Sequence, residues 1–425
     1  MNQIRTPFQT NTTKQPPRVL AVLPALIPST IIDVVTPIID LNRSNDIVAR
    51  ITVENFVKKH DIEWCDLVIL CRNIHPNTAG WFLHVLQLKK PYIYDIDDNF
   101  FEIPANTPLG KYHREPSRIN MLKAYIRLAS LVRVYSGPMY ERAQKLNSNC
   151  VKVTAPVDWR LIQTAPEKKD VQPIKLVYAT SRSTDKLADI FKPALVDILE
   201  KYQGRIEVHF LGYNPPEFRR YRNVFFQPLV FDYENYLKAF SRAGYDIGLA
   251  PLLDDVFHRS KTNNKFREYG ASRIAGIYSN VDVYSTCVEH EHTGYLVENT
   301  PAAWYKAMSE LINNTALRTN IQEHAYKYVR RHYSQETFSE IWLQHINSVL
   351  LFKVAQKKST KSVIELITKN SRSRFISKAL KNILTLAINI AISIAIKIKE
   401  KIKNYIQMYI VLLKIRNKLI HTDKL

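Results

Sequence analysis

Glycine is scarce in this chain, at 10 of 425 residues, and no G-x-G-x-x-G segment occurs in it. That glycine pattern lets the backbone of a dinucleotide-binding domain approach a pyrophosphate closely. Its absence argues against a dinucleotide-binding enzyme of the common type.

Cysteine is rare as well. Cys65, Cys71, Cys150 and Cys287 show no C-x-x-C spacing, so the sequence predicts neither a disulfide framework nor a zinc site. Residues 1–17 are polar and lack the apolar stretch of a secretory signal. We therefore expect a disordered leader and a protein of the reducing cytoplasm.

Acidic residues are few near the C-terminus. Of the net charge of +21, residues 351–425 account for 17 Lys and Arg against three acidic residues. Residues 383–398 are uncharged except for Lys397, but this run is shorter than the roughly 20 residues of a membrane-spanning helix. Lysines around an apolar face are typical of a helix that lies on anionic lipid. We expect residues 376–420 to bind the inner face of the membrane peripherally, or else to form a helical tail that packs on the body or on a partner.

The same tail is poorly suited to nucleic acid. It is rich in isoleucine and contains few aromatic residues for base stacking. No nucleic-acid partner is expected.

The remaining sequence has the alternation of strands and helices that predicts a doubly wound parallel sheet. Apolar, β-branched runs at 18–26, 65–72 and 91–98 are followed by amphipathic stretches, and the pattern resumes after the polar segment 164–173. The predicted fold class is α/β, with two Rossmann-like domains facing across a cleft and a helical basic C-terminal tail. The predicted units are a leader (1–17), a first domain (18–163), a linker (164–173), a second domain (174–325), closing helices (326–350) and a tail (351–425).

The most informative segment is APLLDDVFHRSKTNNKFREYG, residues 250–270. A strand ends near Leu252, and we predict a helix from about Lys261 with Thr262 as its N-cap. A helix N-terminus offers free N–H groups and a partial positive charge, which suit a diphosphate. Lys261 and Lys265, four residues apart on one face, could neutralise the same phosphates, and Glu268 could accept bonds from ribose hydroxyls. A solvated helix face would give the same pattern.

The order of motifs resembles the family 4 retaining glycosyltransferases of the GT-B fold. The segment above is followed by IYSNVDVY and EHEHTGYLVEN, and the N-terminal half adds CDLVILCR and KPYIYDIDDNFFEIP. The resemblance spans residues 18–350. It implies sugar transfer with retained configuration, a nucleotide-sugar donor held by the C-terminal domain, a saccharide or lipid-linked acceptor against the N-terminal domain, and synthesis of cell-surface polysaccharide or glycolipid.

The resemblance also assigns residues. Glu268 matches the second glutamate of the family's Glu-x7-Glu motif, which holds the ribose, and Lys261 and Lys265 match basic residues near the diphosphate. Ser260 stands where the first glutamate is expected, so the group that contacts the donor sugar is open, with Asp254 or Asp255 as substitutes. Basic residues and a helix N-terminus can stabilise the departing diphosphate, and neither a metal ion nor another cofactor is expected.

Two further groups complete the predicted site. Asp97 and Asp98 follow a predicted strand, where they could contact the acceptor or act as a general base, or could cap the following loop. Arg182 could approach the phosphates from the opposite wall, or be an exposed loop residue. His75 and His113, in predicted loops, are not expected to be catalytic.

One alternative assigns no catalysis to the chain. A non-catalytic GT-B subunit or scaffold could keep the nucleotide-sugar site, and Ser260 in place of a glutamate favours that reading.

Overall fold

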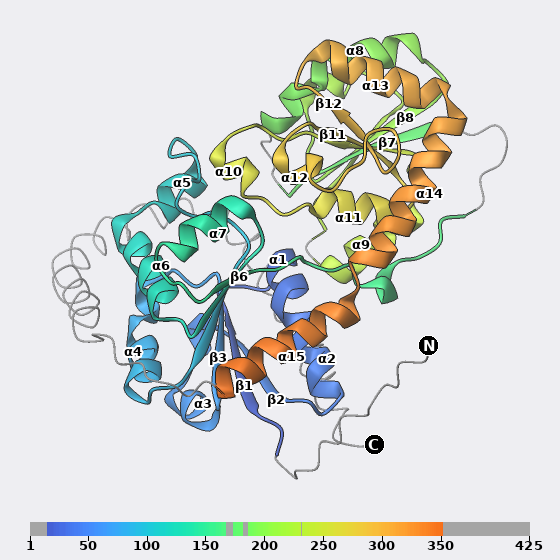
Figure 1. Cartoon of the computed structure of the whole chain (residues 1–425). Coiled ribbons are helices and arrows are strands. Elements are labelled where there is room, and N and C mark those ends of the chain that lie inside the picture. Colours follow the sequence, from blue (N-terminus) through green and yellow to red (C-terminus); the bar gives the residue numbers. More distant parts are fainter. Residues whose placement is uncertain (1–14, 167–172, 182–185, 231, 352–425) are drawn as a thin grey trace, which may run out of the picture.

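The computed structural model describes residues 15–166, 173–181, 186–230 and 232–351. Each half contains a six-stranded sheet, with strand order β2-β1-β3-β4-β5-β6 in the first and β12-β11-β10-β7-β8-β9 in the second. All the strand pairs are parallel. Helices cover both faces of each sheet (Figure 1). The predicted α/β class with two Rossmann-like domains is confirmed.

The elements alternate along the chain in the way that parallel sheets require. The strands are β1 (Arg18–Leu23), β2 (Val48–Val53), β3 (Leu67–Cys71), β4 (Tyr92–Ile96), β5 (Leu131–Val134), β6 (Cys150–Lys152), β7 (Ile174–Ala179), β8 (Ile206–Leu211), β9 (Val224–Gln227), β10 (Ile247–Ala250), β11 (Ala275–Ser279) and β12 (Tyr295–Val297). The α-helices are α1 (Pro28–Thr30), α2 (Thr36–Arg43), α3 (Lys59–Trp64), α4 (Ala79–Gln87), α5 (Pro108–His113), α6 (Pro116–Leu128), α7 (Gly137–Gln144), α8 (Lys192–Lys201), α9 (Tyr233–Arg242), α10 (Val256–Arg259), α11 (Asn264–Ala271), α12 (Asp282–Ser285), α13 (Pro301–Asn313), α14 (Thr315–His332) and α15 (Gln335–Leu351). A π-helical turn, η1 (Ile31–Val35), joins α1 to α2, and short 3-10 turns are η2 (Glu54–Phe56), η3 (Pro76–Thr78), η4 (Trp159–Leu161), η5 (Lys186–Ile190) and η6 (Pro216–Phe218).

Strand β1 shows how each sheet divides its domain into two cores. Leu20 and Val22 belong to one hydrophobic cluster of the first domain, whereas Val19, Ala21 and Leu23 belong to the other. This division follows from the two-residue period of a strand, which sends successive side chains to opposite faces. Both faces are buried, so the central strands are apolar throughout.

The two closing helices pack on different domains. Helix α14 packs on α11 of the second domain, but α15 returns to the first domain and packs on α2 (Figure 1). The Trp342 indole in α15 is fully buried and donates a hydrogen bond to the Asp33 carbonyl at 2.8 Å. The predicted unit 326–350 therefore spans both domains.

The polypeptide crosses between the domains at two points that lie side by side. Val157 N donates to the Tyr333 carbonyl at 3.0 Å, and the Trp159 indole donates to the same oxygen at 3.2 Å. These bonds tie the first crossing to the second, just before α15.

No helix in the described part of the chain is both long enough and apolar enough to cross a bilayer. The tail (351–425) on which the membrane prediction depends lies, apart from Leu351, outside the described residues. That prediction stays untested.

Candidate functional site

The carboxyl end of β4 meets the segment between α10 and α11 at the domain interface. Lys261 Nζ lies 2.7 Å from Asp98 Oδ1, and Asn99 Nδ2 donates to Ser260 Oγ at 3.1 Å. Phe257 of α10 is buried in a core cluster of the first domain. Ligands of parallel sheets bind beyond the carboxyl ends of the strands, so this interface is the expected location of a site.

Arg72 organises the two aspartates predicted to be catalytic. It follows β3 directly in a left-handed conformation (φ 58°), which is uncommon for a residue other than glycine. Its guanidinium pairs with Asp97 and lies 3.5 Å from Asp98 Oδ2. Burial acts to lower the pKa of Arg72, but the two carboxylates outweigh it and raise that pKa. The structure thus places Asp97 and Asp98 at the interface, each paired with a cation.

Asp95, the first carboxylate of the same motif, has a structural environment. It is fully buried, and it accepts hydrogen bonds from Arg133 Nε at 3.0 Å and from the Tyr135 hydroxyl at 3.1 Å. Burial raises its pKa to about 6, although Arg133 opposes that shift. Asp95 therefore ties β4 to β5.

The predicted helix start at Lys261 with Thr262 as N-cap is wrong. Helix α11 begins at Asn264 with Asn263 as its N-cap, and the Thr262 hydroxyl donates to Asn264 Oδ1 at 2.7 Å. The reason is the short helix α10, whose last turn continues through a bond from Lys261 N to the His258 carbonyl at 3.0 Å.

Lys261 and Lys265 consequently do not share a helix face as predicted. Lys261 precedes α11 and reaches across to Asp98, whereas Lys265 Nζ lies 2.8 Å from Glu268 Oε2 within α11. The Tyr236 hydroxyl of α9 lies 3.3 Å from the same Glu268 oxygen.

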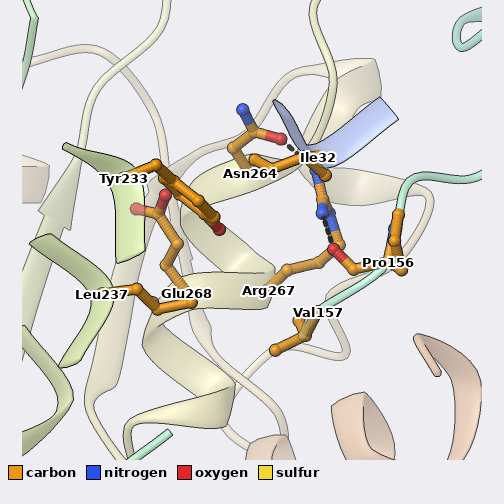
Figure 2. A pocket seen from close by; sticks show the side chains of 8 residues that line it. All are labelled: Ile32, Pro156, Val157, Tyr233, Leu237, Asn264, Arg267 and Glu268. Carbon is orange, nitrogen blue, oxygen red and sulfur yellow. Dashed lines mark hydrogen bonds between the residues drawn. The ribbon is translucent and has the colours of Figure 1, made fainter. Parts of the chain in front are cut away.

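Glu268 lines a small hollow between the domains (Figure 2). Arg267 crosses the hollow and donates to the Pro156 carbonyl, and Asn264 lies beside it (Figure 2). The opposite wall includes Ile32 of η1. The cavity volume of the hollow is only about 10 Å³, far below the ~300–1,000 Å³ of most ligand pockets. The described arrangement is therefore closed.

The two substitutes considered for the first motif glutamate have local partners. Asp254 lies 2.6 Å from Arg259 Nε, and Asp255 caps α10 through His258 N at 2.9 Å and contacts the His258 ring at 2.7 Å. Arg182 lies outside the described residues. Both aspartates brace α10 in the described arrangement.

Sequence reasoning missed several residues that the structure brings to this interface. Arg72 could have been found, because it directly follows a buried strand. Arg267 had no such signal, and neither had Asp33, which is 3% exposed on η1. Burial raises the pKa of Asp33 well above its usual value, and the nearby carboxylates of Asp97 and Asp95 add to that shift. A π-helical turn of this kind often marks a functional segment.

Comparison with known proteins identifies the fold. No protein-family model and no curated protein matches the sequence. Among solved structures, HepE of Anabaena in complex with UDP superposes with a TM-score of 0.55 at 13% identity, covering 78% of this chain and 100% of that one. A glycosyltransferase from Rickettsia africae gives 0.53 at 15%, covering 79% and 99%. A protein from Listeria monocytogenes described as a putative UDP-N-acetylglucosamine 2-epimerase gives 0.52 at 11%, covering 80% and 98%.

These similarities establish a GT-B fold with two Rossmann-like domains. At such low identity the fold alone is shared. Because one fold can serve different reactions, the reaction has to be argued from the site.

Proposed function

We propose that this protein is a retaining glycosyltransferase that moves a sugar from a nucleotide-sugar donor to a saccharide or lipid-linked acceptor. One observation carries the proposal: Glu268, paired with Lys265, faces a hollow between the two domains of a GT-B fold. HepE, which shares this fold, has been crystallised with UDP and with UDP-glucose. A carboxylate at this place can accept bonds from ribose hydroxyls while the lysine turns to phosphate.

The donor-binding proposal assigns a role to each neighbouring residue. Lys261, Lys265 and, outside the described residues, Arg182 neutralise the diphosphate, and Thr262 precedes the helix that points its N-terminus at it. We propose that no metal ion is needed, because the lysines supply the positive charge that the departing diphosphate requires.

Donor entry requires the domains to separate. The hollow is smaller than a nucleotide site, and Lys261 is held by Asp98 of the opposite domain. A diphosphate would replace the Asp98 carboxylate as the partner of Lys261 and release Asp98 toward the acceptor. Asp97 and Asp98 then contact the acceptor hydroxyl or act as its general base.

The biological setting is proposed from the tail. Residues 376–420 combine lysines with isoleucine-rich stretches, which fits attachment to anionic lipid at the cytoplasmic face of a membrane. Synthesis of cell-surface polysaccharide or glycolipid suits an enzyme placed there.

A second candidate function is a non-catalytic nucleotide-sugar-binding subunit. Ser260 is fully buried, donates to the Val256 carbonyl at 2.6 Å and joins Asn99 of the first domain. A side chain used in this way contributes to domain contact and not to sugar binding.

One experiment separates the two functions. Full-length protein is incubated with UDP- and GDP-linked sugars, first alone and then with candidate acceptors. The released nucleoside diphosphate and the products are then measured. An enzyme releases the diphosphate, and NMR of the product then reports whether the anomeric configuration is retained. Tight binding of a nucleotide sugar without any turnover would support the subunit instead.

A further inference from the structure

A second group of polar side chains lies in the first domain, away from the hollow at Glu268. Glu54, Asn73 and Asn99 follow β2, β3 and β4, so the parallel sheet brings them to one edge. Arg118, in the first turn of α6, and His113, at the end of α5, extend the group. Together these five residues form what we call the β-edge cluster.

Arg118 is the unusual member of the β-edge cluster. Its side chain is 11% exposed, and its guanidinium stacks over the Tyr112 ring at 3.6 Å. No described residue forms a hydrogen bond with its Nε or Nη1. Nε lies 3.3 Å from Glu115 Oε2, but without hydrogen-bond geometry, and Glu115 is half exposed to solvent. A nearly buried guanidinium with unmet donors is costly unless a ligand satisfies it.

Other polar atoms of the β-edge cluster are also unsatisfied. Within the described residues, Asn73 Oδ1, Asn99 Oδ1 and His113 Nδ1 are buried without a hydrogen-bond partner. The amide groups of the two asparagines are anchored, since Asn73 donates to Glu54 at 2.8 Å and Asn99 to Ser260 at 3.1 Å. The unbonded oxygens of Asn73 and Asn99 can accept hydrogen bonds from hydroxyl groups, and Arg118 can donate hydrogen bonds to an anion.

The charges near His113 favour an anion. Burial lowers the pKa of His113 to about 4, and the neighbouring Arg72, Arg118 and Lys261 add to that shift, whereas Asp98 opposes it. The imidazole is therefore neutral near pH 7, and three cationic side chains lie close enough to it to disfavour a further positive charge. His113 also stacks on Phe100, with ring centroids 4.3 Å apart, in the loop that contacts Ser260 through Asn99.

We propose that the β-edge cluster is the acceptor subsite for a hydroxyl-bearing, anionic group, a phosphate or a carboxylate, with Arg118 as its main anchor. The identification of the bound molecule as an acceptor rests on the proposed glycosyltransferase function, but the anion-binding site itself does not. The unmet donors of Arg118 bind the anion, and the free oxygens of Asn73 and Asn99 accept from hydroxyls of the same molecule. The cluster adjoins Asp98, so an acceptor held there presents its hydroxyl at the interface.

Calorimetric titration of the full chain tests the subsite with glycerol 3-phosphate, D-glucuronate and D-glucose as probes. UDP at high concentration is present, so that phosphate cannot report on the donor site. We expect at least one anionic probe to bind and D-glucose to bind more weakly. Arg118→Gln should weaken the anionic probe at least tenfold, and Arg118→Lys should weaken it less. Which of the two anions binds identifies the acceptor's charged group.

Arg127→Gln, an exposed position in the last turn of the same helix, is the matched control and should bind like the wild type. Each variant's thermal unfolding is recorded, so that a loss of folded protein is not read as a loss of affinity. If neither anion binds the wild type, or if folded Arg118→Gln and Arg118→Lys bind both anions as the wild type does, the subsite is refuted. UDP and GDP affinities are measured in parallel. If the wild type binds neither UDP nor GDP, the proposed function is refuted, whereas nucleotide binding without an effect of Arg118 would refute only the subsite.

Discussion

Replacement of Glu268 by glutamine perturbs the donor site with the least structural change. The side chain is 9% exposed, and its oxygen pairs with Lys265 at 2.8 Å and the Tyr236 hydroxyl at 3.3 Å. Glutamine has the same shape and retains one accepting oxygen, but it removes the negative charge. The lost ion pair is mostly buried, with side chains 25% and 11% exposed, so its loss should cost more than the roughly 0.3–0.5 kcal/mol of an exposed helical pair. Because glutamine can still accept a hydrogen bond from Lys265, we expect the free energy of unfolding to fall by about 1–2 kcal/mol.

The effect on nucleotide binding should be larger. Hydrogen bonds to a charged group contribute about 1.5–3 kcal/mol, which corresponds to a loss of roughly 10- to 150-fold in affinity for the nucleotide. The assay is calorimetric titration with UDP and GDP, accompanied by urea unfolding. Glu234→Gln is a matched control, because Glu234 also pairs with a lysine one turn away, at 3.9 Å from Lys238, but on the exposed face of α9. Unchanged nucleotide affinity in folded Glu268→Gln would refute the donor-site assignment.

Three further predictions address charge, attachment and pH. Lys261→Met should weaken binding of a nucleoside diphosphate about tenfold, measured by calorimetry, because it removes one phosphate contact. Lys306→Met, at an exposed position of α13, should leave the affinity unchanged. Equal affinities of the two variants would contradict the role of Lys261. Removal of residues 352–425 should abolish flotation with anionic liposomes while UDP affinity is unchanged, and continued flotation would place the lipid contact elsewhere. Burial, with a contribution from Arg133, lowers the pKa of His345 to about 4, so the unfolded chain binds this proton near pH 6.5 before the folded chain does. Stability in urea should therefore fall as pH drops from 6.5 toward 4, less steeply in His345→Gln, and parallel pH profiles would contradict this.

The fold was largely predictable because its strands are buried on both faces. Strands such as β3, with sequence LVILC, and β10 appear as short apolar runs between turn signals. Strand β2 was missed because it lies at the sheet edge, where its residues are mostly exposed or half-buried and include Arg50 and Thr52. Its apolar pattern is correspondingly weak.

The contacts at the domain interface were predicted only in part, because a sequence does not show which charges meet across two domains. The segment around Lys265 and Glu268 could be located, since it is local and the two residues are neighbours on one helix. The pairing of Lys261 with Asp98 joins residues far apart in the chain, and no local pattern marks it. Thr262 was assigned as a cap because the short helix α10 was not anticipated, and its last turn delays the start of α11.

The return of α15 to the first domain could not be predicted from the sequence either. Trp342 packs against the guanidinium of Arg133 at 3.6 Å, and His345 Nδ1 lies 2.8 Å from the same arginine. The periodicity of α15 predicts a helix but not the domain that it covers.

The most direct test of the account is a structure of the full-length protein crystallised with UDP or GDP. We predict ribose hydroxyls within hydrogen-bond distance of the Glu268 carboxylate, the diphosphate beside Lys265 and Lys261, and Lys261 released from Asp98. A nucleotide bound elsewhere, or Glu268 still paired with Lys265 and out of reach of the ribose, would contradict it.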